Sequence, residues 1–481
     1  MHFLTRLVNF FTGNKTEYPY EPKAKKDGFY TTEPNYACIA TTITSLRKHN
    51  NADRLQIANV FGNSIICGLE TKMGDRVLYF PLECQLSEEF AAQNDLLRRK
   101  DENGKPAGGM FDNNRRVRCQ TLRGEKSEGF IIPLGAIQYI NGKPGAFDNI
   151  KDGASFNTII ERGIEWGICK KYVKPLTRKE QRQQVQLKRQ KPRVSRLIDG
   201  QFRFHFDTLQ LGRNSHLLNP TSLISISLKL HGTSFICANV LTKRKLSLWE
   251  RLLKKVGFNI DDSVYDLVYS SRAVIRNKYL DDPKQSHDYY GGDLYGAVAN
   301  EFRGKLYEGE TVYGEAVGFT DTGKAIQSCY DYGCKPNDGP PFKLYVYRIT
   351  NTASDGRVVE LGWPQVVARA KELFQEAPET IFYGYAGDWT EGIVGGKDKE
   401  EVLRNWQDAF INQARVFVEG LGNSKLCRNK VPEEGICVRI EGLEPRTLKI
   451  KSFAFLKVES DNLDNPEVVD LEAEESEEES A

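Results

Sequence analysis

Residues 225–234, Ser-Ile-Ser-Leu-Lys-Leu-His-Gly-Thr-Ser, alternate apolar and polar side chains until the pattern ends at a glycine. Alternation with a period of two predicts a half-buried β-strand, and the glycine predicts a turn. Lys229 therefore stands at the end of a strand. A lysine amine is a weak nucleophile at its ordinary pKa of about 10.4, but nearby positive charge or desolvation frees it to attack phosphorus or carbonyl centres. The alternative is a solvent-exposed lysine before a turn, because Lys-x-x-Gly is common by chance.

The length of 481 residues exceeds one ordinary domain and predicts two domains with tails. Hydrophobic residues make up 40% of the chain, and the mean hydropathy is -0.51. No apolar run approaches the ~18 residues of a membrane span, and the first eleven residues lack the apolar core of a signal peptide. We therefore expect a soluble cytoplasmic protein, monomeric and without a membrane partner.

The ten cysteines are scattered, without a Cys-x-x-Cys pair or a Cys/His cluster. This spacing favours neither a zinc site nor a disulfide framework. Free thiols in a reducing cytoplasm are the expected state.

Charge is distributed unevenly along the chain. Residues 459–481 contain 11 acidic and no basic residues, so residues 1–458 carry 67 basic against 54 acidic residues, a net charge of +13. A basic body suits a polyanionic partner, and the acidic tail, expected to be disordered, either competes with that partner or aids solubility.

The N-terminal part of the chain predicts a β-rich module after an extension over residues 1–36. Short strand-like runs broken by Gly, Asn and Pro fill residues 37–173 and are typical of a small OB-like β-barrel. Small barrels often bind single-stranded nucleic acid through basic faces. Four arginines on one strand-like segment are candidate nucleic-acid contacts, with a solvated strand as the alternative: Arg115, Arg116, Arg118 and Arg123.

A basic linker over residues 174–201 precedes the second domain. Residues 170–196 contain 11 basic residues and one acidic residue, which favours phosphate contacts over a merely solvated segment. The second domain, residues 202–458, mixes strands and helices. We expect strands at 221–230, 311–318 and 342–350, and helices at 249–256, 364–374 and 397–418.

Five short motifs follow Lys229 in chain order, at residues 270–272, 312–316, 342–347, 434–439 and 448–452. With residues 229–234, they resemble the ordered motifs of the covalent nucleotidyltransferases, which include polynucleotide ligases and RNA capping enzymes. Within this superfamily the chain is most similar to ATP-dependent RNA ligases with an OB module before the adenylyltransferase domain. That similarity extends through residues 74–81, 115–124 and 204–208. It implies an α+β fold of antiparallel sheets with flanking helices.

The resemblance implies a role for each motif. Lys229 would attack the α-phosphate of ATP and form lysyl-AMP, while Lys449, Lys451 and a divalent cation, Mg²⁺ or Mn²⁺, lower its pKa and neutralise phosphate oxygens. Lys449 and Lys451 alternate with Ile450 and so share one strand face. A solvated basic strand is the alternative.

Further residues would bind the nucleotide. The resemblance assigns Gly232 and Arg272 to this site, Glu315 to the ribose, and Glu434 to both nucleotide and metal. For each carboxylate the alternative is a surface or N-cap position. One aromatic side chain, Tyr345 or Phe342, would stack on adenine, with core packing as the alternative.

The activity implied is ATP-dependent joining of 3'-OH and 5'-phosphate RNA ends, including nicks in duplex RNA, as in RNA repair. AMP would pass from Lys229 to the 5'-phosphate, and the 3'-hydroxyl would then displace it. Two alternatives remain: a GTP-dependent capping enzyme, disfavoured because no OB domain follows the last motif, and a non-catalytic RNA-binding protein.

Overall fold

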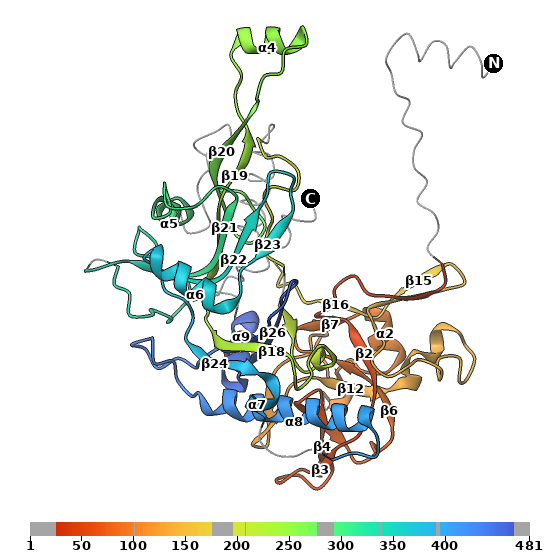
Figure 1. Ribbon diagram of the computed structural model, residues 1–481. Helices are drawn as coiled ribbons and strands as arrows, with labels where there is room; N and C mark the ends of the chain where they lie inside the picture. Colours follow the sequence, from red (N-terminus) through yellow and green to blue (C-terminus); the bar gives the residue numbers. More distant parts are fainter. Residues whose placement is uncertain are drawn as a thin grey trace, which may run out of the picture. The chain divides into compact units, whose positions relative to one another are not determined.

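The computed structural model describes residues 26–100, 102–104, 106–175, 196–206, 208–276, 293–336, 338–390 and 395–465. The chain forms two compact units. Unit 1 comprises Met1–Thr42, Asp75–Val117 and Ile131–Lys171, and unit 2 comprises Ile43–Gly74, Arg118–Phe130 and Tyr172–Ala481. Figure 1 labels the helices and strands where there is room.

Unit 1 consists of short antiparallel sheets. Its largest sheet has the strand order β12-β6-β2-β13, and a second has the order β1-β14-β15. Phe80 and Phe90 pack together in its core, with ring centroids 5.3 Å apart. The strands are β1 Gly28–Tyr30, β2 Cys38–Thr42, β6 Arg76–Phe80, β7 Cys84–Leu86, β8 Arg99–Lys100, β9 Pro106–Gly108, β12 Phe130–Pro133, β13 Ser155–Phe156, β14 Thr158–Glu161, β15 Ile164–Gly167 and β16 Cys169–Lys171; the helices are α2 Glu88–Gln93 and η1 Leu134–Ile140.

The N-terminal β-rich expectation is confirmed, but the OB-like barrel is not. Among the described residues, the strands over 37–173 pair in separate small sheets that form no closed barrel. Residues 43–74 and 118–130 group with unit 2 rather than with the rest of the expected module. They contain β3 Leu46–Lys48, β4 Leu55–Val60, β5 Asn63–Gly68, β10 Gln120–Leu122 and β11 Glu125–Ser127. Strand patterning therefore predicted the elements but not their grouping.

The first large sheet of unit 2 has the order β17-β26-β25-β18-β24. Apolar residues on alternate positions of its strands, including Ile226 and Val438, pack against Phe410 and Ala414 of α8 Lys399–Gly420. Its elements are β17 Leu209–Gln210, β18 Leu223–Lys229, β24 Thr380–Tyr385, β25 Gly435–Ile440 and β26 Arg446–Lys451, with α7 Ala386–Trp389 and η2 Ser215–Leu217.

The second large sheet has the order β20-β19-β21-β22-β23. Phe235 and Val312 from this sheet pack with Val298 of α5 and Trp363 of α6 in one apolar core. Its elements are β19 Thr233–Lys243, β20 Ser263–Ser270, β21 Glu310–Gly318, β22 Phe342–Thr352 and β23 Val358–Glu360, with α4 Leu248–Lys255, α5 Leu294–Asn300 and α6 Trp363–Glu372. The expected strands and helices of this domain are confirmed to within three residues at each end.

The last described helix, α9 Phe453–Asp464, corrects the expected start of the acidic tail. Ser452 caps it by accepting a hydrogen bond from the backbone N–H of Phe455, and the Phe455 side chain is buried. The Ser452 cap and the buried Phe455 side chain stabilise the start of this helix, and the buried Ser460 stabilises its continuation beyond residue 458. Residues 466–481, and most of the expected basic linker, lie outside the described residues. None of the helices in the described segments is long and apolar enough to cross a membrane.

Candidate active site

Lys229 ends β18 where the chain leaves the first sheet of unit 2 for the second. The backbone N–H of His231 donates to Tyr332 Oη at 2.7 Å, and that of Gly232 donates to Glu315 Oε1 at 2.9 Å. A Cβ on Gly232 would lie 2.3 Å from the Ala316 carbonyl oxygen. Only glycine therefore fits this close approach between the turn and β21.

A buried carboxylate faces Lys229. Glu434 precedes β25, and the antiparallel β25–β26 pair sets Gly435 opposite Lys451. Glu434 Oε1 lies 2.8 Å from Lys229 Nζ and 3.3 Å from Lys451 Nζ, and the Glu434 side chain is 2% exposed. One carboxylate thus pairs with two ammonium groups, from β18 and β26, the two strands that flank β25 in this sheet.

The pKa of Lys229 is raised in the structure, whereas the sequence analysis expected it to be lowered. Burial has the largest effect and lowers the pKa of Lys229, but Glu434 and Glu315 raise it, and the net pKa lies above the ordinary 10.5. Lys451 lowers it, as expected, but is outweighed. For Glu434, burial has the largest effect and raises the pKa. The charges of Lys229 and Lys451 outweigh it and hold the pKa of Glu434 below the ordinary 4.5. In the protein alone, the pair is an ammonium and a carboxylate.

A cavity of about 180 Å³ in unit 2 collects residues from most of the motifs. The motif residues Lys229, Gly232, Arg272, Glu315 and Lys449 all line it. Arg272 lies two residues after the end of β20, Glu315 lies in β21 and Lys449 in β26, so both large sheets contribute. Glu434 and Lys451 do not line the cavity themselves: Glu434 contacts the lining residue Lys229, and Lys451 contacts Glu434.

Of the aromatic residues in the 342–347 motif, Tyr347 lines the cavity and Tyr345 and Phe342 do not; Phe206 and Trp363 line it as well. Tyr345 is 3% exposed and packs in an apolar core with Tyr332, while Phe342 packs against the core of the second sheet. A bulge explains the difference: Arg348 pairs with Tyr313 and Val346 with Gly314, so Tyr347 has no partner on β21. The extra residue breaks the alternation that would put Tyr345 and Tyr347 on one face.

His205 also lines the cavity, although sequence reasoning gave it no role. Its ring centroid lies 5.1 Å from that of Tyr347. Burial, followed by the charges of Arg348 and Arg272, lowers the pKa of His205 to about 3. The imidazole is therefore neutral near pH 7, and its buried Nδ1 has no hydrogen-bond partner in the described part of the chain. Its only sequence signal was its place in the matched segment 204–208.

Solved structures of a Naegleria gruberi RNA ligase have a similar fold. The structure with PPi has a TM-score of 0.50 and 13% identity, covering 88% of this chain and 98% of that one. A lysine-to-alanine mutant with ATP and Mn has a TM-score of 0.50 and 12% identity, covering 89% and 100%. The chain has an RNA ligase fold. No protein-family model and no curated protein matches the sequence.

Lys451 is held in place by residues of α8 and α9. Lys451 Nζ lies 2.6 Å from Glu459 Oε1 on α9, and Arg415 of α8 donates to the Lys451 carbonyl oxygen at 3.1 Å. Arg415 also pairs with the buried Glu128 at 3.1 Å. These contacts fix the position of Lys451 beside Glu434, and the sequence analysis did not identify them.

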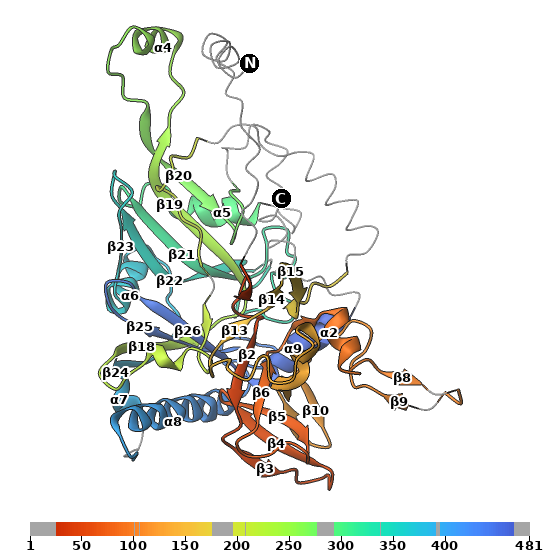
Figure 2. The ribbon, with the colours of Figure 1, turned by 90° about the vertical axis from the view of Figure 1, so that its right-hand side faces the viewer.

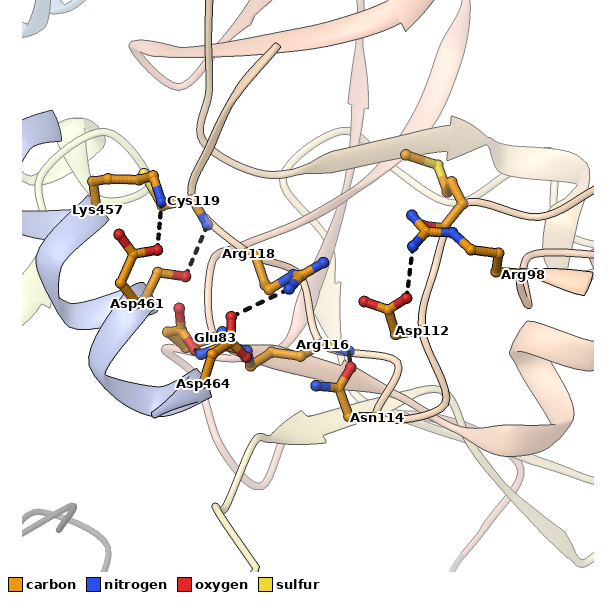
Figure 3. A network of polar contacts seen from close by, with 12 residues as sticks. Glu83, Arg98, Asp112, Asn114, Arg116, Arg118, Cys119, Lys457, Asp461 and Asp464 are labelled. Atoms are coloured by element: carbon orange, nitrogen blue, oxygen red, sulfur yellow. Dashed lines mark hydrogen bonds and ion pairs between the residues drawn. The ribbon is translucent and has the colours of Figure 1, made fainter. Parts of the chain in front are cut away.

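The structure separates the four arginines that were predicted to lie together on a strand. In unit 1, the Arg116 guanidinium is buried and pairs with Glu83 at 2.8 Å, and the Arg115 Nε donates to the Leu86 carbonyl oxygen. Figure 3 shows the Arg116–Glu83 pair. Because the Arg116 side chain is buried, its guanidinium is not accessible to a phosphate.

The other two predicted arginines belong to unit 2. Arg118 pairs with Asp464 of α9 at 3.2 Å. Arg123 is exposed in the turn between β10 and β11, where Arg123 and Gly124 have φ values of 47° and 87°. Two positive φ values are typical of a tight hairpin turn, which presents the Arg123 side chain to solvent.

Proposed function

We propose that the protein is an ATP-dependent RNA ligase that joins 3'-OH and 5'-phosphate ends through a lysyl-AMP intermediate. The observation that carries this proposal is the convergence of Lys229, Arg272, Glu315 and Lys449 on one cavity, with Glu434 against Lys229. These residues are distant in sequence, and packing alone gives no reason to gather three cations and two carboxylates around one cavity.

In the first step, the Lys229 amine attacks the α-phosphorus of ATP. A nitrogen–phosphorus bond forms, the bond from that phosphorus to the bridging oxygen breaks, and pyrophosphate leaves with the electron pair. The amine has to be neutral at attack, whereas Glu434 holds it as an ammonium in the protein alone. Lys229 therefore loses one proton before attack, which Glu434 Oε1 at 2.8 Å can accept, and a second as the phosphoramidate forms, which leaves with pyrophosphate or passes to solvent.

Glu434 suits a divalent cation, Mg²⁺ or Mn²⁺. Its buried Oε2 atom has no hydrogen-bond partner in the described residues, although a buried carboxylate oxygen is costly to leave unsatisfied. No group of three His, Cys, Asp or Glu side chains able to hold a metal occurs in the described residues. Mg²⁺ usually binds one or two carboxylates together with substrate phosphates and waters, so a single buried carboxylate such as Glu434 can contribute to its site. When bound, such an ion supplies positive charge that favours a neutral amine and neutralises phosphate oxygens.

The remaining cavity residues take complementary roles. Arg272 and Lys449 provide positive charge for the phosphates, Glu315 accepts from a ribose hydroxyl, and Gly232 permits close approach of the nucleotide. Tyr347 replaces Tyr345 and Phe342 as the residue proposed to stack on adenine, since it lines the cavity.

The RNA partner belongs to the same proposal. AMP passes to a 5'-phosphate, and the 3'-hydroxyl then attacks the activated end and releases AMP. Residues 37–173, and among them the exposed Arg123, would contact strands flanking the break, with Arg115 and Arg118 as further candidates.

Intact mass spectrometry after incubation with ATP and Mg²⁺ or Mn²⁺ tests the first step. We expect an AMP adduct on the wild-type protein and on Lys399→Ala, an exposed control on α8, and none on Lys229→Ala. An equal adduct on Lys229→Ala would refute the mechanism. An adduct from GTP instead of ATP would indicate a capping-type enzyme, and no adduct from either would favour a non-catalytic RNA-binding protein.

Sealing assays test the substrate. Nicked duplexes carrying RNA or DNA on each side of the nick separate an RNA ligase from a DNA ligase, and a 5'-hydroxyl end serves as the unreactive control. We expect sealing only where a 5'-phosphate meets an RNA 3'-hydroxyl.

A further inference from the structure

Helix α4 stands at the end of the long β19–β20 hairpin, within unit 2 (Figure 1). Figure 2 shows it again at the far end of the hairpin, away from the body of the sheet. The helix is locally well formed, because Ser247 and Glu250 make a capping box at its N-terminus. None of its residues is buried.

The apolar face of α4 is unusually exposed. Leu248, Trp249, Leu252, Leu253 and Val256 recur at the spacing of one helix face, and they are 81%, 76%, 53%, 39% and 66% exposed. Phe258, just beyond the helix, is 61% exposed. None of the six belongs to the hydrophobic cores described for unit 2. A contiguous apolar patch of this kind marks an interaction surface rather than a solvated helix.

Basic side chains surround this face, which we term the hairpin-tip face (residues 248, 249, 252, 253, 256 and 258). Residues 243–262 contain six basic and three acidic residues, a net charge of +3. The acids are already engaged: Glu250 pairs with Arg244 at 2.7 Å, Asp262 pairs with Lys254 at 2.5 Å, and Asp261 accepts from Ser263. Four exposed cations have no acidic partner in the described part of the chain: Lys243, Lys245, Arg251 and Lys255.

We propose that the hairpin-tip face binds an anionic lipid surface, with α4 lying in the membrane interface. A short helix that combines Trp and Leu on one face with Lys and Arg on the other has the pattern of an interfacial helix. The unpaired cations complement anionic headgroups, while the aliphatic side chains have no counterpart in a nucleic acid. Projection on a hairpin lets the helix reach a flat surface without moving the active-site cavity.

Vesicle co-sedimentation of the full chain tests this proposal. We expect binding to phosphatidylcholine vesicles that contain phosphatidylglycerol, much weaker binding to phosphatidylcholine alone, and a decrease with added salt. The variant Trp249→Ser/Leu253→Ser should bind anionic vesicles at least about tenfold more weakly. Leu443→Ser removes a fully exposed leucine elsewhere in unit 2 and should bind like the wild type.

A charge variant separates the two contributions. Lys245→Gln/Lys255→Gln removes two of the four cations and should weaken binding to anionic vesicles at low salt and reduce its salt dependence, with the apolar face intact. Circular dichroism checks that each variant is folded. Absence of vesicle binding by the wild type, or equal binding by Trp249→Ser/Leu253→Ser, would overturn the proposal. Stoichiometric binding of a protein partner through this face, without vesicle binding, would also overturn it.

Discussion

Lys229 and Glu434 form an ion pair at the end of β18, with Nζ and Oε1 2.8 Å apart and the carboxylate almost completely buried. This pair couples the proposed nucleophile to the proposed metal ligand. The negative charge of Glu434 keeps Lys229 protonated in the protein alone. The binding of substrates therefore has to lower the pKa of Lys229 before the amine can attack.

The stability of this pair should depend on acid pH. Because the folded-state pKa of Glu434 lies below 4.5, its charge stabilises the fold above pH 4.5, and this contribution is lost as pH falls through the lowered pKa. Glu434→Gln leaves Lys229 and Lys451 without their carboxylate. We expect a lower Tm for the variant at pH 7 and a difference that shrinks in acid, measured by calorimetry across pH. A constant difference would contradict the pairing.

Replacing Tyr347 should weaken nucleotide binding. Base–aromatic stacking contributes roughly 1–3 kcal/mol, so Tyr347→Ala should raise the ATP concentration needed for half-maximal lysyl-AMP formation by about tenfold or more. Tyr347→Phe retains the ring and should restore most of the affinity. Phe342→Ala should lower thermal stability but leave the ATP requirement unchanged; the reverse pattern would return the stacking role to Phe342.

His205 should remain neutral across the physiological range. With its pKa lowered to about 3, the imidazole resonance in NMR spectra should not shift between about pH 5 and pH 8. The unfolded chain binds a proton at this residue below about pH 6.5 while the folded chain does not, so His205 favours unfolding as pH falls. A titration midpoint near 6.5 in the folded protein would contradict its burial.

Substitution of Arg116 should affect stability, whereas substitution of Arg123 should affect RNA binding, although the sequence predicts the same role for both. Arg116→Ala breaks a buried pair with Glu83 and should destabilise unit 1 by about 3 kcal/mol, seen as a lower urea midpoint. Arg123→Ala should leave stability unchanged, weaken RNA binding and reduce the salt dependence of affinity by about one ion. Loss of RNA affinity in folded Arg116→Ala alone would reverse this assignment.

A truncation that tests the acidic tail should begin after α9, at residue 466, rather than at residue 459. Removing residues 466–481 should tighten RNA binding at low salt, because the acids compete with RNA for basic surface. Removing residues 459–481 also deletes Glu459 and its contact with Lys451, and should lower both stability and lysyl-AMP formation. Unchanged RNA affinity in the shorter truncation, measured by anisotropy, would leave solubility as the role of the tail.

The sequence by itself determined the strands and the order of the motifs. Alternation predicted β18, β21 and β22 nearly to their ends, because side-chain period is a local property of a strand. The motif order singled out Lys229, Arg272, Glu315 and Lys449, all of which line one cavity.

Tertiary structure alone decided which neighbours each residue has. The bulge at Tyr347 depends on the pairing of β22 with β21, the burial of Arg116 on its packing against Glu83, and the exposure of α4 on the absence of an apolar partner in the described residues. The protonation of Lys229 depends on a carboxylate 205 positions away in the chain. Electrostatic and packing energies act through space, so a one-dimensional pattern identifies the reactive lysine without revealing the charge it carries.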